Sequence, residues 1–187
     1  MKKSIIVAML AAIVLSALSA CGAKETDTSA KDNADPAVTQ DETIDPDAIV
    51  GDICTEFAYL DGFTFTSSST ELGEYLDDDL IRSFYGDVND VPDFTKVSSY
   101  CVYIDQSDAR TLNDVGVFVL ADASYADTLM QYLQARIDQK IANAANYPDF
   151  DVESLKKAVV KKVGSTVYYL ATADVDAFAP ILKETIG

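Results

Sequence analysis

Histidine and tryptophan are both missing from this 187-residue sequence. The lack of histidine removes the side chain that most often acts as a general base near neutral pH, and with it every His-dependent catalytic triad. It also removes the commonest protein ligand of transition metals. We therefore expect no metal site, no cofactor and no enzyme activity of the histidine-dependent classes.

Basic residues are scarce. The chain has 14 Lys and Arg against 31 Asp and Glu, which gives a net charge of −17. Such a charge repels the phosphates of nucleic acids and the headgroups of anionic lipids. We therefore expect no nucleic acid partner. The apolar fraction of 49% is nevertheless large enough for a folded core.

Cysteine occurs only three times, and Cys21 closes a segment with the features of a secretory signal. Two lysines follow Met1, residues 5–18 are apolar apart from Ser16, and small residues precede Cys21. A positive start, an apolar middle and a small-residue cut site are typical of signal peptides. The 14 residues of the apolar region are fewer than the roughly 20 that a membrane-spanning helix needs.

The segment Leu18-Ser19-Ala20-Cys21 resembles the lipobox of bacterial lipoprotein precursors. The resemblance implies diacylglyceryl transfer to the thiol of Cys21 and cleavage after Ala20. Each methylene of an acyl chain buried in the membrane contributes about 0.8 kcal/mol to anchoring. We predict a signal peptide over residues 1–20 and lipidation of Cys21, with palmitate-type chains holding the protein at the extracytoplasmic face of the cell membrane. The alternative is an ordinary signal peptide followed by a chance cysteine.

Residues 21–46 have the composition of a tether. From Gly22 to Pro46 there is no aromatic residue and little large apolar surface, whereas Asp, Glu, Thr, Ser and Ala are frequent. Such segments bury too little apolar surface to offset the entropy of ordering, so we expect a disordered acidic spacer. Once Lys2 and Lys3 are removed with the signal, 12 basic residues face 31 acidic ones, a net charge of −19.

Residues 47–187 indicate a single α+β domain. Apolar residues spaced by three or four predict helices from Asp47, over 78–84, over 122–144, briefly over 151–157, and from Asp174. Alternating β-rich segments predict strands over 97–104, 115–121, 158–163 and 166–172. Because strands and helices do not alternate, we expect an antiparallel sheet of about four strands with helices packed mainly on one face. Gly86 is expected to end the second helix in a left-handed conformation, and Pro180 to kink or restart the last.

Few side chains outside the core suggest chemistry. Cys54 and Cys101 could form a disulfide outside the cytoplasm, but both also occupy apolar positions where a cysteine acts as a small hydrophobe. Ser154 begins an S-x-x-K motif, although its companion motifs are out of order and chance explains it better. Acids near 74–79 and 87–93 could bind Ca²⁺, but the EF-hand spacing fails, and solvated acids are the simpler interpretation.

Basic residues cluster at one place. Lys156, Lys157, Lys161 and Lys162 supply four of the basic residues within seven positions. The first pair suits a helix C-terminus and the second pair protects an edge strand, but together they could contact an anionic partner. Arg136 could also bind a carboxylate, although its place beside the apolar stripe of the long helix favours an internal salt bridge.

The folded part resembles an uncharacterised family of small lipoproteins from Gram-positive (Firmicutes-type) bacteria, a domain of unknown function. The resemblance covers most of residues 79–173. It rests on Tyr85-Gly86, on residues 100–104 and 115–118, on Arg136 with Gln139-Lys140 and Tyr147-Pro148, and on a hairpin with Gly164 and residues 167–169. It implies a fold and a location, but no activity.

Three functions remain open at this point. The first is a non-catalytic domain that binds an envelope protein or wall polymer at the membrane surface. The second is an accessory lipoprotein that binds a small solute or wall fragment. The third, which we favour least, is a hydrolase that uses carboxylates or a Ser–Lys pair.

Overall fold

The computed structural model describes residues 44–59, 61–87, 90–105 and 113–186. The chain divides into Met1–Thr39 and Gln40–Gly187, and all described residues belong to the second unit. The predicted signal peptide, Cys21 and nearly all of the predicted tether lie outside the described residues. The folded part begins before Asp47, because Asp45 caps the first helix and Ile44 packs against the core.

The domain combines five helices with five strands in its described residues. In chain order these are α1 (Pro46–Glu56), β1 (Gly62–Thr66), α2 (Asp78–Tyr85), β2 (Val97–Asp105), β3 (Asp114–Leu120), α3 (Ala126–Ala144), α4 (Val152–Leu155), β4 (Val159–Val163), β5 (Thr166–Ala171) and α5 (Val175–Ile186). Short 3-10 turns, η1 (Phe94–Lys96) and η2 (Ala123–Tyr125), precede β2 and α3.

The strands form one antiparallel sheet in the order β1-β2-β3-β5-β4. This confirms the predicted α+β class and the antiparallel sheet, but the sheet has five strands where about four were expected. The additional strand is β1, in a segment rich in Thr and Ser. Residues 63–66 read Phe-Thr-Phe-Thr and do alternate apolar and polar, but the alternation is short and runs into a polar segment, and only Phe65 is buried. Antiparallel pairing with β2 extends over all five residues of β1.

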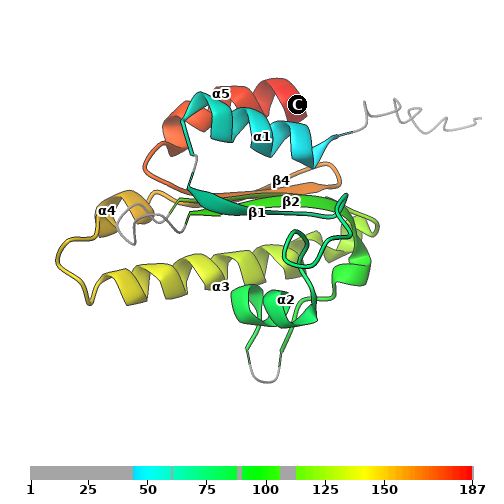
Figure 1. Cartoon of the computed structure of the whole chain (residues 1–187), viewed down its shortest axis with the longest axis horizontal. Helices are drawn as coiled ribbons and strands as arrows, with labels where there is room; N and C mark the ends of the chain where they lie inside the picture. The colour runs from blue at the N-terminus through cyan, green and yellow to red at the C-terminus, as the bar shows by residue number, and fades with distance from the viewer. Residues whose placement is uncertain (1–43, 60, 88–89, 106–112, 187) are drawn as a thin grey trace, which may run out of the picture. The chain divides into compact units, whose positions relative to one another are not determined.

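The helices cover both faces of the sheet, which corrects the expectation of one covered face (Figure 1). Helices α2 and α3 pack on one face, and α1 and α5 on the other. The reason lies in β2, β3 and β5, which are apolar on both sides. Along β2, Tyr100, Val102 and Ile104 enter the core with α3, whereas Cys101 and Tyr103 enter the core with α1 and α5. A central strand with two apolar faces needs a cover on each.

One helix end differs from the sequence prediction, and one helix continues through a proline. Gly86 ends α2 with a φ of −108°, so its conformation is extended and not left-handed. A side chain there would crowd the carbonyl oxygen of Asp90 at 3.0 Å, so the position favours glycine because of close backbone approach. Helix α5 runs without a restart through Pro180, which lies in its second turn. The proline has no N–H to donate to the carbonyl of Asp176, so the helix continues past it with one backbone hydrogen bond fewer.

The hairpin of β4 and β5 is confirmed as predicted. Gly164 and Ser165 form a two-residue turn, and Val163 pairs with Thr166 across it. Gly164 has a φ of +57°, a conformation that costs glycine little. The hairpin places β4 at one end of the sheet.

Candidate functional site

A largely buried group of charged side chains lies between α3 and the sheet. We refer to it as the Asp114 cluster, formed by Asp114, Arg136, Lys140, Tyr169 and Tyr85. The carboxylate of Asp114 has no exposed surface. Its Oδ2 accepts from Arg136 at 2.8 Å (Nε) and 2.6 Å (Nη2), and from Nζ of Lys140 at 2.9 Å. Its Oδ1 accepts from the hydroxyl of Tyr169 at 2.6 Å.

Local geometry brings these groups together. Arg136 and Lys140 are four residues apart on α3, so both point to the same side of the helix. Asp114 and Gly116 are two residues apart on β3, so both lie on the face of the sheet that α3 covers. Gly116 pairs with Tyr169 of β5. Because Gly116 has no side chain, the ring of Tyr169 can lie across it and reach Asp114.

The charge of Asp114 is balanced within the cluster. Burial by itself would raise the pKa of Asp114, but the charges of Arg136 and Lys140 and the bond from Tyr169 outweigh it and hold that pKa below its usual 3.8. Arg136 also donates to the carbonyl of Phe84 at 3.2 Å and lies 4.9 Å from the centre of the Phe84 ring. The expected internal salt bridge of Arg136 is therefore confirmed, and Arg136 is not placed to contact an outside anion.

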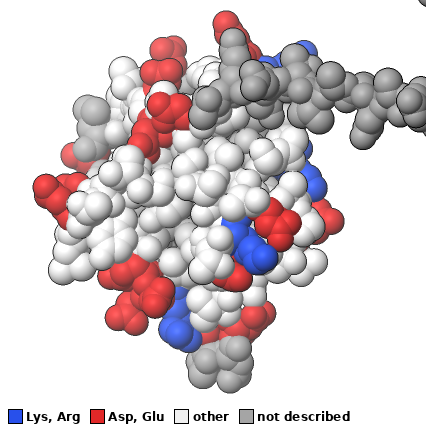
Figure 2. All heavy atoms as spheres, turned by 90° about the vertical axis from the view of Figure 1, so that its right-hand side faces the viewer, with Lys and Arg blue, Asp and Glu red and all other residues white. Residues whose placement is uncertain are grey.

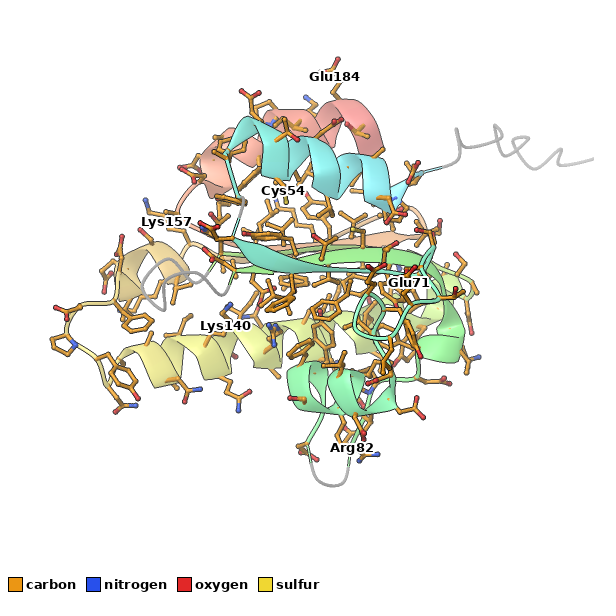
Figure 3. All side chains as sticks on the ribbon, in the orientation of Figure 1. Cys54, Glu71, Arg82, Lys140, Lys157 and Glu184 are labelled. Carbon is orange, nitrogen blue, oxygen red and sulfur yellow. The ribbon has the colours of Figure 1, made fainter. Side chains whose placement is uncertain are left out.

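Sequence reasoning missed Asp114 itself, which lies directly before the strand predicted over 115–121. The available signal was an acid directly before an apolar strand, together with two basic residues four apart beside an apolar helical stripe. Figure 3 shows the result: Lys140 lies between α3 and the sheet, whereas Arg82 of α2 points outward.

The four clustered lysines are all exposed, but two of them follow α4 and the other two lie on β4. Lys156 follows α4 and pairs with Glu153 at 2.6 Å, both at the surface. Lys161 and Lys162 lie on β4, which is the end of the sheet, as the edge-strand interpretation predicts. We call these two residues the lysine pair. They are the exposed cations that the fold places along an open strand.

Cys54 and Cys101 are free thiols, so the disulfide that the sequence allowed is not formed. Both belong to the core under α1 and α5, and Figure 3 shows Cys54 between α1 and the sheet. Burial raises the pKa of Cys54 to about 11. Burial and the nearby carboxylate of Asp47 raise the pKa of Cys101 as well. Both thiols stay protonated near neutral pH and are poor nucleophiles.

The remaining sequence candidates serve turns and caps. Ser154 donates its hydroxyl to Asp151, and its N–H is bonded to Oδ1 of the same residue at 3.0 Å, as in an N-capped turn. Asp93 caps η1, and Asp87 accepts from the N–H of Asp90 at 2.9 Å. Within the described ranges no group of three or more Cys, Asp or Glu could hold a metal ion. Asn89, in the acidic segment 87–93, and Ser107-Asp108, the Ser-Asp companion of the S-x-x-K motif, lie outside those ranges.

A hollow of about 310 Å³ opens between the end of α2 and α3. Its walls combine aromatic, acidic and amide side chains: Tyr85, Asp87, Asp90, Gln131 and Tyr132, with Gly86, Thr128 and Ala135. The hydroxyl of Tyr132 donates to Asp90 at 2.5 Å and so links two residues that line the hollow. The hollow adjoins the Asp114 cluster through Tyr85, whose hydroxyl lies 3.3 Å from that of Tyr169.

No protein-family model, curated protein or solved structure matches the chain. The resemblance of residues 79–173 to the lipoprotein family therefore stays a prediction. Among the helices of the described residues, none is long and apolar enough to cross a bilayer.

Proposed function

We propose that this chain is a lipoprotein, anchored through Cys21 at the outer face of a bacterial cell membrane, whose folded domain binds an acidic envelope component without catalysis. The anchor is supported by the sequence from Met1 to Cys21. The binding role is supported chiefly by one observation, the exposed lysine pair on the open edge strand of a strongly acidic protein.

The charge distribution supports this role. Figure 2 shows acidic side chains at several separate places on one face and fewer basic ones, which lie close to acids. The interior cations Arg136 and Lys140 are held by Asp114. A local cationic strand on such a molecule attracts an acidic partner that the rest of the surface repels.

The geometry of the other reactive groups favours binding over catalysis. A catalytic carboxylate or thiol needs a perturbed pKa near neutrality and access to a substrate. Asp114 is fully buried with a lowered pKa, and both thiols are shielded with raised ones. Ser154 is bonded to Asp151 and not to a lysine.

A second candidate is small-ligand binding in the hollow between α2 and α3. Its volume of about 310 Å³ is at the lower end of the range of ligand sites. Two tyrosine rings and two carboxylates would suit a polar or cationic solute or wall fragment. A thermal shift with such compounds, lost in Tyr132→Ala and kept in Lys161→Glu, would favour this candidate over the first.

Anchoring is tested by metabolic labelling with palmitate. The wild-type chain should incorporate label and sediment with membranes, and Cys21→Ala should do neither, because the thiol is the acceptor. Cys54→Ala is the matched control and should label like wild type. Equal labelling of wild type and Cys21→Ala would contradict the anchor.

Binding is tested by crosslinking in intact cells. The double variant Lys161→Glu/Lys162→Glu should lose at least about fivefold of the captured acidic partner, because reversed charges repel it. Lys183→Glu changes an exposed lysine of α5 and should capture normally. Equal capture by all three proteins would exclude the lysine pair as the binding surface.

A further inference from the structure

The two ends of the sheet differ. At one end, β1 is followed by a segment that turns back, and the N–H of Thr66 donates to the carbonyl of Glu74 at 2.8 Å. At the other end, no further described strand pairs with β4. An open edge strand is a template on which another extended chain can pair.

The register shows which backbone groups of β4 face that open side. Val163 and Thr166 close the two-residue turn and are therefore a hydrogen-bonded pair. Hydrogen-bonded and non-hydrogen-bonded pairs alternate along the two strands. The backbone N–H and C=O groups of Val159 and Lys161 therefore also point at β5. The carbonyl of Ser165 accepts from Leu120 of β3 at 2.9 Å, which agrees with this alternation. The N–H and C=O groups of Val160 and Lys162 consequently point outward.

The same register assigns the side chains to faces. Lys161 pairs with Tyr168, whose ring lies in the core under α1 and α5, and Lys162 pairs with Val167, in the core under α3. The lysine pair therefore places one cation on each side of the edge. Two consecutive residues of an added strand also point to opposite sides, so two consecutive acids would meet both lysines.

A groove lies beside this edge on the α3 side. It has a volume of about 340 Å³ and is lined by Met130, Val160, Gln131, Gln134 and Asp127. Val160 points to the same face as Lys162 because the two are separated by one residue. The residue of an added strand that sits opposite Val160 would enter this groove and contact Met130.

We propose that β4 accepts an extended acidic segment of a partner protein as a sixth, antiparallel strand. The segment carries two consecutive acidic residues opposite Lys162 and Lys161 and then an apolar residue opposite Val160. This inference rests on the proposed binding function and specifies the partner. A second copy of the chain fits poorly, because antiparallel pairing of two β4 strands brings lysines against lysines.

The test uses the full chain and the peptide acetyl-Thr-Glu-Glu-Val-Thr-Ser-amide. On binding, the amides of Val160 and Lys162 should gain protection in hydrogen exchange, because they become ladder donors. N-methylation of the first glutamate and of the valine removes the two inward donors and should weaken binding at least about tenfold. N-methylation of the second glutamate, whose N–H points away, is the matched control and should matter far less.

A charge exchange provides the second arm. Lys161→Glu/Lys162→Glu should lose the acidic peptide and bind the peptide in which both glutamates are lysine, whereas Lys183→Glu should behave as wild type. No binding at millimolar peptide, or equal binding of all N-methylated forms, would overturn strand addition. Equal binding of all N-methylated forms would mean that the lysines attract any polyanion, such as a wall polymer.

The other outcomes separate this inference from the proposed function. Concentration-dependent dimers with protected β4 amides would overturn the inference in favour of a second copy. If cells yield a partner that depends on the lysine pair but leaves the β4 amides unprotected, the proposed function stands and strand addition fails. If no lipid and no partner are found, the proposed function fails.

Discussion

At the residue scale, Asp114 shows how one buried charge can join several elements. It begins β3, and its partners come from α3 and β5. A fully buried carboxylate is tolerated only when its charge is balanced and its oxygens are bonded. Both conditions are met, and no described buried side-chain nitrogen or oxygen lacks a hydrogen-bond partner.

Asp114→Asn should lower the free energy of unfolding by about 3–5 kcal/mol near neutral pH, because it leaves two largely buried cations without their counter-charge. Urea unfolding followed by circular dichroism measures this. Asp176→Asn, at an exposed position of α5, is the control and should change little.

The cost of that substitution should depend on pH. The pKa of Asp114 is lowered in the folded protein, so its contribution is complete above the unfolded value of about 3.8 and is lost as the pH falls through the folded value. The stability difference between wild type and Asp114→Asn should therefore be constant above about pH 5 and shrink below pH 3.8. A difference that grows in acid would contradict the lowered pKa.

At the element scale, the contact between β3 and β5 depends on an absent side chain. A Cβ at Gly116 would collide with the ring of Tyr169, which is fully buried and holds Asp114. The sequence shows this glycine inside an apolar strand, but it does not show which ring crosses it. That contact joins residues far apart in the chain.

Gly116→Ala should destabilise the domain by about 1–3 kcal/mol through overpacking, with more lost if Tyr169 moves off Asp114. Gly51→Ala is a matched control with the opposite sign. Gly51 lies exposed in α1 with open space around it, so alanine there should stabilise the helix by up to about 1 kcal/mol. Chemical unfolding of both variants checks the pair. Equal effects would refute the steric role of Gly116.

At the scale of the whole domain, a single sheet supports two cores. Leu133 of α3 and Ile53 of α1 are both fully buried, on opposite sides of the sheet. Neighbouring residues of β2, β3 and β5 contribute to the two cores in alternation. Loss of packing on one side therefore disturbs strands that the other side needs.

Leu133→Ala and Ile53→Ala should each cost about 2–5 kcal/mol, and each should leave one unfolding transition. Tyrosine fluorescence and far-ultraviolet circular dichroism should report the same midpoint in both variants. Two separate midpoints in either variant would show that the cores unfold independently.

The amino-acid sequence determined the elements whose pattern is local. The apolar stripe of α3, the alternation along β2 and the turn at Gly164 depend on neighbours within a few residues, so periodicity reveals them. The segment that ends at Cys21 also has a local pattern, and lipidation there stays a prediction. Only the tertiary structure decided the rest.

Asp114 meets Arg136 across 22 positions and Tyr169 across 55. The strand β1, the covering of both sheet faces and the place of β4 at the edge also depend on which segments become neighbours in space. A sequence records the surfaces that can be buried, whereas the partners that bury them follow from packing the whole chain at once.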